Sequence, residues 1–491
     1  MNDGAIDALA IQASALRRAG RVLEAITAYE KLLALRPELA ESWYNLGWLQ
    51  RQARRFEAAL DSYQQALDRG VSMPEEVQLN RAVILSDHLG RNDEAAAELA
   101  RALVRNPDYV PALLNLGNLE EDMGERDRAK ICYERALKID PDNVLALARS
   151  AGLVSPAGPD DPLVARLRAT LGRPNISAEE SADLGFALGR LLDAGGDFDS
   201  AFTVYAAANR DSRKSLIETG HSVYDAGRHE NFVDRLIRAF ARPVEPVAAN
   251  PDSVPVFICG MFRSGSSLTE QILASHSRVA AGGERDLIPS LIASHLQPYP
   301  EVCEGLGPAD LDRLRRRYID GLGASAHEDR LITDKRPDNF LHIGLIKAMF
   351  PGAKIIHTRR QPLDNILSLY FLHLNPQMSY GSDLLDAAHW YGQYRRLMSH
   401  WSALYPGDIF DLDYDVLVGD PKPAIAALLE FCGLRWEENC LAHHRAPGTV
   451  KTASVWQVRE PLYRRSSGRW RNYAAHVAAL RGVLEGHQQI P

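Results

Sequence analysis

The stretch Val254–Ser267, which reads VPVFICGMFRSGSS, decides the fold of the second half of this chain. Apolar residues run into Gly260, a turn rich in glycine and serine follows, and a helical pattern begins after it. A buried strand that ends in such a turn aims backbone N–H groups at an anion, and the dipole of the following helix favours negative charge there. The stretch therefore predicts a phosphate site in an α/β domain.

The turn has the glycine spacing of a nucleoside-triphosphate loop but lacks the lysine of such a loop. Gly260 and Gly265 are five residues apart, and Ser267 stands at the hydroxyl position. Ser266 occupies the position of the lysine that reaches the β- and γ-phosphates, and Arg263 is the only cation of the turn. A P-loop kinase or ATPase is therefore disfavoured, and we expect a phosphate-bearing donor other than ATP or GTP.

Composition narrows the class of protein. The chain has 491 residues, 46% of them hydrophobic and 24% charged, which suits two or three globular domains. A formal net charge of −8 argues against nucleic acid or an anionic membrane as partner. The cysteines are scattered without CxxC spacing and no histidines have a metal-ligand spacing, so we expect no metal. No signal-like start or apolar run of about 20 residues occurs, which predicts a cytoplasmic location.

The first half repeats itself with a period close to 34 residues. Prolines recur within similar short stretches at Pro37, Pro74, Pro107 and Pro141, and tyrosines recur at matching places at Tyr29, Tyr63 and Tyr133. The pattern resembles the tetratricopeptide repeat, in which each unit is a pair of amphipathic helices that must stack on its neighbours. We expect repeats from about residue 9 to 153, with a degenerate third one in which Leu99 replaces the tyrosine.

The same reading divides the chain. A further helix pair is expected at 181–210, after an interruption at 154–175 that is rich in proline, glycine and aspartate. The all-α repeat domain then spans 1–242, a proline-dense linker spans 243–253, and an α/β domain spans 254–491.

In the α/β domain, short β-like runs alternate with helical stretches. The expected strands are Val254–Cys259, Leu331–Thr333, Lys354–His357 and Ile409–Leu412, and the helices between them include Leu268–Ala274, Ala309–Gly323, Ile343–Phe350, Asp364–Phe371 and Leu384–Tyr405. This alternation predicts a parallel sheet with helices on both faces. Ligands of such sheets bind beyond the carboxyl ends of the strands, where the Arg263 turn, Lys335 and Arg360 all fall.

Three further motifs follow the turn. Glu284 comes after two glycines in AAGGERDLIP, and Lys335 ends a strand before a proline in LITDKRP. In KIIHTRRQPLDNILS, a strand runs into Arg359 and Arg360, and Ser368 lies eight residues after the second arginine. Taken alone, Arg360 could be an ion-pair partner of a carboxylate one helical turn on, and Glu284 a helix N-terminal charge. The order and spacing of the whole set favour a functional site.

With these motifs, residues 254–473 resemble the sulfotransferases that use 3′-phosphoadenosine 5′-phosphosulfate (PAPS), and in particular the tyrosylprotein sulfotransferases. The resemblance implies that the residues Arg263, Ser264, Gly265, Ser266 and Ser267 hold the 5′-phosphosulfate. It implies that Arg360 and Ser368 hold the 3′-phosphate, and that Tyr414, Ser454 and Gln457 lie at the nucleotide. Glu284 is then the general base, and Lys335 is the catalytic cation together with Arg263.

The chain departs from the family pattern at three places, one of which is Gln361, where an acidic residue usually follows the second arginine of the motif. Glu460 stands where a basic residue often precedes Pro461, so Arg459 or Arg464 is expected to substitute for it. The turn after Lys335 carries Arg and Pro instead of the histidine base of small-molecule sulfotransferases. The base should therefore be Glu284.

The expected reaction needs no metal, because arginines and amides bind the phosphates while positioning and electrostatics do most of the catalysis. The acceptor is expected to be a hydroxyl on a peptide or protein, such as a tyrosine, which the repeats would grip. A saccharide or small-metabolite acceptor is the alternative within the enzymes. A repeat scaffold with an inactive nucleotide-binding domain is the alternative from another class. The oligomeric state is left open.

Overall fold

The computed structural model describes residues 3–154, 161–243, 254–322, 330–445 and 455–488. The chain divides into two compact units, Met1–Val154 and Ser155–Pro491. The predicted linker at 243–253 lies almost entirely outside the described residues.

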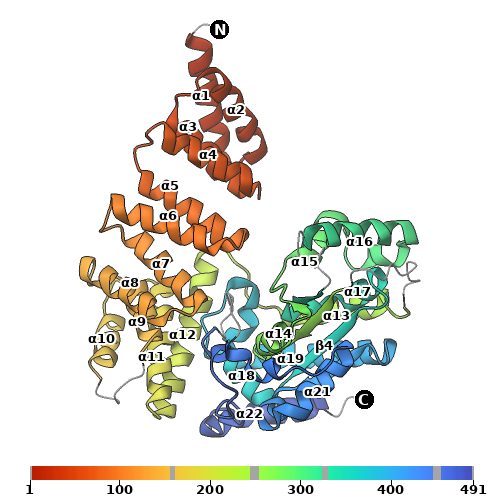
Figure 1. Cartoon of the computed structure of the whole chain (residues 1–491). Helices are drawn as coiled ribbons and strands as arrows, with labels where there is room; N and C mark the ends of the chain where they lie inside the picture. The colour runs from red at the N-terminus through yellow and green to blue at the C-terminus, as the bar shows by residue number, and fades with distance from the viewer. Residues whose placement is uncertain (1–2, 155–160, 244–253, 323–329, 446–454, 489–491) are drawn as a thin grey trace. The chain divides into compact units, whose positions relative to one another are not determined.

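The first unit is a row of helices that stack pair after pair (Figure 1). They are α1 (Asp3–Arg18), α2 (Val22–Leu35), α3 (Ala40–Gln52), α4 (Phe56–Asp68), α5 (Pro74–Val83), α6 (Asn92–Arg105), α7 (Val110–Met123), α8 (Arg126–Ile139) and α9 (Val144–Gly152). The expected tetratricopeptide pairs are thereby confirmed. A π-helical turn, η1 (Ile84–His88), continues α5 in the degenerate third repeat, where the predicted Leu99 is buried in place of a tyrosine.

Glycine sets how closely two helices of a pair approach. A Cβ placed on Gly47 would lie 2.8 Å from the ring of Tyr63, and one on Gly117 would lie 2.5 Å from the ring of Tyr133. Both tyrosine rings are fully buried against these glycines. The recurring Gly and Tyr of the sequence therefore form one packing contact, which is repeated along the unit.

The second unit begins with four more helices, namely α10 (Pro162–Leu171), α11 (Ala178–Ala194), α12 (Phe198–Glu218) and α13 (Ala226–Ala239). The pair expected at 181–210 is present as α11 and α12, and a Cβ on Gly189 would lie 2.7 Å from the ring of Tyr205. The stretch predicted as an interruption contains α10, capped by the Asp161 side chain, which accepts the N–H of Leu163.

A five-stranded parallel sheet forms the centre of the second unit. Its strands are β1 (Val256–Gly260), β2 (Val279–Ala280), β3 (Leu331–Lys335), β4 (Lys354–Arg359) and β5 (Ile409–Asp413), in the order β2-β3-β1-β4-β5. Four of these strands were predicted. The two-residue β2, paired with β3 through Val279 and Leu331, was not, because so short a strand leaves no periodic pattern.

The remaining helices cover both faces of this sheet, as the alternation predicted. They are α14 (Ser266–Ala274), α15 (Leu287–His295), α16 (Pro308–Leu322), α17 (Ile343–Met349), α18 (Pro362–Tyr370), α19 (Leu384–Leu404), α20 (Tyr414–Gly419), α21 (Pro421–Cys432) and α22 (Ala478–Gln488). Phe257 of the central strand packs with α13 and α16 to α19 on one face. Ile258 packs with α14 and α21 on the other face. This alternation places the end of β1 between two apolar cores.

Within the described ranges, no helix has both the length and the apolar character that a membrane crossing requires.

Candidate active site

The turn after β1 is held against β4 by close packing. Gly260 has φ +148°, and a Cβ there would lie 2.3 Å from the carbonyl oxygen of Thr358. Ser264 is buried, and its hydroxyl hydrogen-bonds to the Thr358 hydroxyl at 2.6 Å. The Ser264 side chain thus anchors the turn, whereas Gly265, Ser266 and Ser267 line a pocket at the N-terminus of α14.

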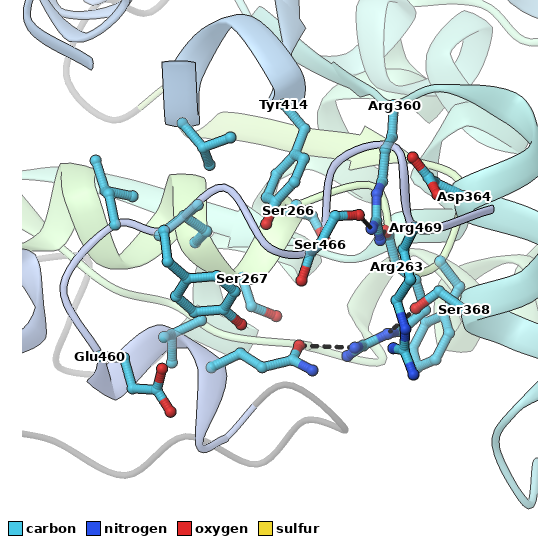
Figure 2. Close-up of a pocket in the computed structure, with 18 of the residues that line it drawn as sticks. Arg263, Ser266, Ser267, Arg360, Asp364, Ser368, Tyr414, Glu460, Ser466 and Arg469 are labelled. Carbon is cyan, nitrogen blue, oxygen red and sulfur yellow. Dashed lines mark hydrogen bonds between the residues drawn. The ribbon is translucent and has the colours of Figure 1, made fainter. Parts of the chain in front are cut away.

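Arg263 occupies an unusual backbone conformation at the base of this pocket. Its φ of +69° lies in the left-handed region, which costs a residue with a Cβ on the order of 1 kcal/mol or more. Its guanidinium donates to the Ser368 hydroxyl at 3.1 Å and to Gln457 Oε1 at 2.7 Å, the latter drawn in Figure 2. Burial, and then the charge of Arg360, lower the pKa of Arg263 to about 10. The pocket is therefore strongly electropositive on this side.

The two adjacent arginines after β4 have different environments. Arg359 forms ion pairs with Asp411 at 3.0 Å and Asp413 at 4.0 Å. Arg360 lines the pocket and donates to the carbonyl oxygens of Arg263 and Ser466, and its buried Nε has no hydrogen-bond partner among the described residues. No carboxylate of the described residues forms an ion pair with Arg360. Its guanidinium is thus available to an anion in the pocket.

Asp364 stands one helical turn further on, and among the described residues its carboxylate forms no ion pair with Arg360, although the charge of Arg360 acts on it. Its carboxylate accepts the backbone N–H groups of Gly468 at 2.6 Å and Trp470 at 2.7 Å. Burial raises the pKa of Asp364. This carboxylate therefore fixes a later segment of the chain against α18.

Tyr414 forms another wall of the pocket, at the start of α20. The Arg360 guanidinium lies 5.0 Å from the centre of its ring, in a cation–π contact. A Cβ on Gly265, whose φ is +104°, would lie 2.9 Å from the same ring. Glycine at this place therefore lets the turn and the tyrosine approach each other.

Glu284 and Lys335 meet at the ends of β2 and β3. The Lys335 ammonium donates to the Glu284 carboxylate, and their side chains are 1% and 35% exposed, respectively. The buried Glu270 of α14 accepts the N–H of Gly283 at 2.9 Å and the Thr333 hydroxyl at 2.8 Å. Burial raises the pKa of Glu270. The loop that carries Glu284 is thus tied to the helix that begins at the pocket.

The pocket brings together most of the residues singled out from the sequence. About 960 Å³ of space, open solvent at its mouth included, is lined among others by Arg263, Gly265, Ser266, Ser267, Glu284, Arg360, Ser368, Tyr414 and Gln457. Ser264 and Lys335 lie behind this lining, and Ser454 falls outside the described residues. Figure 2 shows Arg263, Arg360, Ser368 and Tyr414 around the same space.

Glu460, which departs from the family pattern, has its charge paired within its own segment. Glu460 lines the pocket and forms an ion pair with Arg465. Arg464 donates to the carbonyl oxygen of Gly419, and neither it nor Arg459 lines the pocket. The expected substitution of a cation by Arg459 or Arg464 stays a prediction.

Several pocket residues were not singled out from the sequence. Arg469, Ser466 and Tyr463 all line it, and they come from a segment that folds back over α18 and α20. Arg469 forms an ion pair with Asp193 of α11. Nothing in the local sequence distinguishes this arginine from a surface cation.

His443 is the one imidazole in the pocket lining. It is fully buried, and within the described part of the chain neither ring nitrogen has a hydrogen-bond partner. Burial lowers the pKa of His443 to about 4, so its ring is neutral near pH 7. His276 and His357 instead bond to Arg435 and Asp411 away from the pocket. Across the described parts of the chain, no three His, Cys, Asp or Glu side chains are grouped as a metal site would require.

A second pocket, also of about 960 Å³ with its open mouth included, shares Phe262, Glu284 and Pro337 with the first. Trp390 and Tyr380 stack at 4.1 Å in its wall. Glu284 therefore lines both the cationic pocket and a second pocket that has an aromatic wall.

Comparison with known proteins agrees with this architecture. Residues 255–438 match the model of a sulfotransferase family, and residues 12–74 and 110–143 match models of the tetratricopeptide repeat. An uncharacterized protein of Aquifex aeolicus is 35% identical over 66% of this chain. The chain spans only 44% of the length of that relative.

A further relative and a solved structure are similar to part of this chain at lower identity. Protein-tyrosine sulfotransferase 2 of Gallus gallus is 22% identical over 44% of this chain and 62% of its own length. The sulfotransferase domain of the olefin synthase of Synechococcus PCC 7002 aligns with a TM-score of 0.36 and 21% identity, over 46% of this chain and 90% of that domain. By its matches to the family models, the chain carries tetratricopeptide repeats and a sulfotransferase-family domain in one polypeptide.

Proposed function

We propose that the protein is a PAPS-dependent sulfotransferase that transfers a sulfuryl group to an acceptor hydroxyl. The observation that carries the proposal is the pocket itself, because Arg263, Arg360 and Ser368 face the same space as Glu284. A cationic wall suits a donor with several phosphates, and a carboxylate at its edge suits a base that meets the acceptor.

The donor fits the residues present. The Nε of Arg360, which has no partner among the described residues, can donate to an anion. The backbone N–H groups at the N-terminus of α14, which begins at Ser266, can do the same. We assign the 5′-phosphosulfate to the turn from Arg263 to Ser267 and the 3′-phosphate to Arg360 and Ser368. Tyr414 and Gln457 complete the nucleotide side of the pocket, and Ser454 remains a prediction from the resemblance.

Glu284 and Lys335 would divide the chemistry of transfer between them. PAPS supplies an activated sulfuryl group whose bridging oxygen leaves with the adenosine bisphosphate. Glu284 would take the proton of the acceptor hydroxyl, a contribution typically worth about 10²–10⁴-fold in rate. Lys335 would give up its hydrogen bond to Glu284 and neutralise the negative charge that develops on the leaving oxygen, with Arg263 as a second cation.

The acceptor we favour is a tyrosine on a peptide or protein. The second pocket would receive it, since its stacked Trp390 and Tyr380 offer a flat apolar wall and Glu284 lies at its inner end. The name of the Gallus relative supports the same acceptor, and the repeats would bind the peptide around it. A saccharide or a small metabolite remains the alternative acceptor. We place the protein in the cytoplasm, since its cysteines are all free and buried.

The first test is donor binding by calorimetry, with adenosine 3′,5′-bisphosphate compared with ADP. Arg359→Ala is a matched control for Arg360→Ala, because Arg359 is adjacent in sequence yet ion-paired away from the pocket. We expect wild type and Arg359→Ala to bind the bisphosphate, and Arg360→Ala to bind it about 10- to 100-fold more weakly, as loss of a charge-assisted contact predicts.

Transfer is then measured with PAPS and a tyrosine peptide, a saccharide and a small phenol. Equal binding of ADP and the bisphosphate would contradict the donor assignment. Tight bisphosphate binding without transfer to any acceptor would favour the scaffold with an inactive domain.

A further inference from the structure

The helix pair α11–α12 is joined to the pocket through one arginine. Arg469 lines the pocket, and its backbone is fixed by its neighbours Gly468 and Trp470, whose N–H groups both bond to Asp364. Figure 2 shows Arg469 on the same side of the pocket as Arg263 and Arg360. The pocket therefore contains a third guanidinium that comes from outside the phosphate-binding turn.

Asp193, at the end of α11, holds this guanidinium. One carboxylate oxygen forms the ion pair with Arg469, and the other accepts the hydroxyl of Tyr473. The Asp193 side chain is only 11% exposed, whereas that of Arg469 is 37% exposed and so reaches solvent at the pocket. A buried carboxylate with both oxygens bound fixes the position of its partner much more firmly than a surface ion pair does.

Further contacts within the second unit make α11–α12 a rigid support. The Asn209 side chain donates to the carbonyl oxygen of Tyr370 at 2.8 Å, at the end of α18. The Tyr205 ring stacks on Phe371 at 4.3 Å, and Phe371 also lines the pocket. Both contacts reach the helix that carries Ser368. The pair therefore contacts both the end of α18 and the segment that carries Arg469.

Charge explains why such a support is needed. Three guanidiniums that face one space repel each other, and the described residues give Arg360 no carboxylate partner. Asp193 supplies one negative charge behind Arg469, which lets this arginine stay at the pocket before an anion arrives. Without that charge, Arg469 would gain free energy by turning to solvent.

We propose that Arg469 binds a phosphate group of the donor and that Asp193 is its positioning residue, so that α11–α12 is part of the donor site. This inference rests on the proposed function, because it needs a donor with phosphates. It gives the last repeat-like pair a role in nucleotide binding, which differs from the peptide binding expected of repeats.

The test measures the affinity of the full chain for adenosine 3′,5′-bisphosphate at two salt concentrations. The variants are Arg469→Gln, Asp193→Asn and the double variant. Asp183→Asn is the matched control, because Asp183 lies on the same helix and bonds His373 at 2.7 Å without holding a pocket arginine. Thermal unfolding of each variant without ligand reports whether it folds.

We expect Arg469→Gln to weaken binding by about 10- to 100-fold and Asp193→Asn by about 5- to 10-fold, while Asp183→Asn stays within about 2-fold. The double variant should bind no more weakly than Arg469→Gln alone, because Asp193 acts through Arg469. The loss in both single variants should shrink at high salt. If Asp193→Asn does not fold, Arg469→Gln and Arg469→Lys carry the test.

Wild-type affinity in a folded Arg469→Gln variant would overturn the inference. Equal losses in Asp193→Asn and Asp183→Asn, or additive losses in the double variant, would overturn the positioning role of Asp193. A wild-type chain that does not prefer the bisphosphate to ADP would overturn the proposed function itself, which is a separate result.

Discussion

The helix pair α7–α8 of the first unit and the pair α11–α12 of the second share one packing rule but differ in what they hold. In each, a glycine lies under a tyrosine ring, Gly117 under Tyr133 and Gly189 under Tyr205. The Tyr133 hydroxyl donates to Glu121 of its own pair at 2.6 Å, whereas the Tyr205 ring stacks on Phe371 beside the pocket. The local sequence therefore sets the geometry of a pair, and distant residues decide its use.

The largest expected contrast between the units is in catalysis. Glu284→Gln should lower kcat by about 10²–10⁴-fold, because the amide cannot take the acceptor proton. The affinity for adenosine 3′,5′-bisphosphate should stay within about 3-fold, since Glu284 is assigned to the acceptor side. Steady-state sulfuryl transfer and calorimetry check both values.

The control for this variant is Glu121→Gln, the same chemical change in the first unit. It should leave kcat within about 2-fold of wild type. A loss of rate there, or full activity of Glu284→Gln, would contradict the assignment of the base.

The next contrast tests the shared packing rule. Leucine at Gly117 or at Gly189 overpacks a tyrosine ring and should cost about 1–3 kcal/mol of stability in either pair. Only Gly189→Leu should also weaken bisphosphate binding, by about 5-fold or more, because its pair supports Phe371 and Arg469. Urea unfolding and calorimetry measure the two effects. Equal losses of affinity from both variants would remove the distinction between the pairs.

A smaller contrast concerns buried carboxylates and pH. Glu98 of the first unit is paired with Arg81 at 2.9 Å and Arg101 at 3.0 Å, whereas Asp334 of the second accepts hydrogen bonds from Tyr318 and Asn339. Burial raises the pKa of Asp334 to about 6. The native state then binds the proton of Asp334 more tightly than the unfolded chain does, so protonation of this carboxyl stabilises the folded protein in acid. That contribution to the free energy of unfolding is lost as the pH rises through about 6.

Asp334→Asn should remove that dependence. The difference in unfolding free energy between the variant and wild type should shift in favour of the variant between about pH 4.5 and about pH 7. The shift should be at most about 3 kcal/mol. Urea unfolding at the two pH values measures the difference, and Glu98→Gln, which breaks a buried pair, should destabilise at both. A difference between Asp334→Asn and wild type that does not change with pH would contradict the raised pKa.

The smallest contrast lies between two tyrosines of the first unit. Tyr133 donates to Glu121, whereas the buried Tyr63 hydroxyl has no partner. Tyr133→Phe should cost about 1 kcal/mol of stability, and Tyr63→Phe should be neutral or slightly stabilising. Chemical denaturation resolves this difference. A larger loss of stability in Tyr63→Phe than in Tyr133→Phe would show that the hydrogen bonding of the two hydroxyls does not determine the difference.

The sequence predicted features that depend on neighbours in the chain or on strand order. The recurring prolines and tyrosines predicted the repeats, and the alternation of strands and helices placed Arg263, Lys335 and Arg360 at one edge of the parallel sheet. It did not predict β2, which has two residues, or the helix α10 in a stretch rich in proline and glycine. It also missed Arg469, because the partner that sets its role, Asp193, is 276 residues away.

The link between Asp193 and Arg469 also bears on how the protein is made. During synthesis, the pairs of the first unit can close as each helix emerges, since their contacts are local. Asp193 can pair with Arg469 only after 276 more residues have been synthesised, which at cellular elongation rates takes roughly 15 to 55 seconds. Until then the aromatic side of α12 lacks part of its final cover, because Phe198 and Phe202 contact Tyr473 of the same late segment. The helix pair α11–α12 at the start of the second unit is therefore the part of the nascent chain most exposed to aggregation or to chaperones.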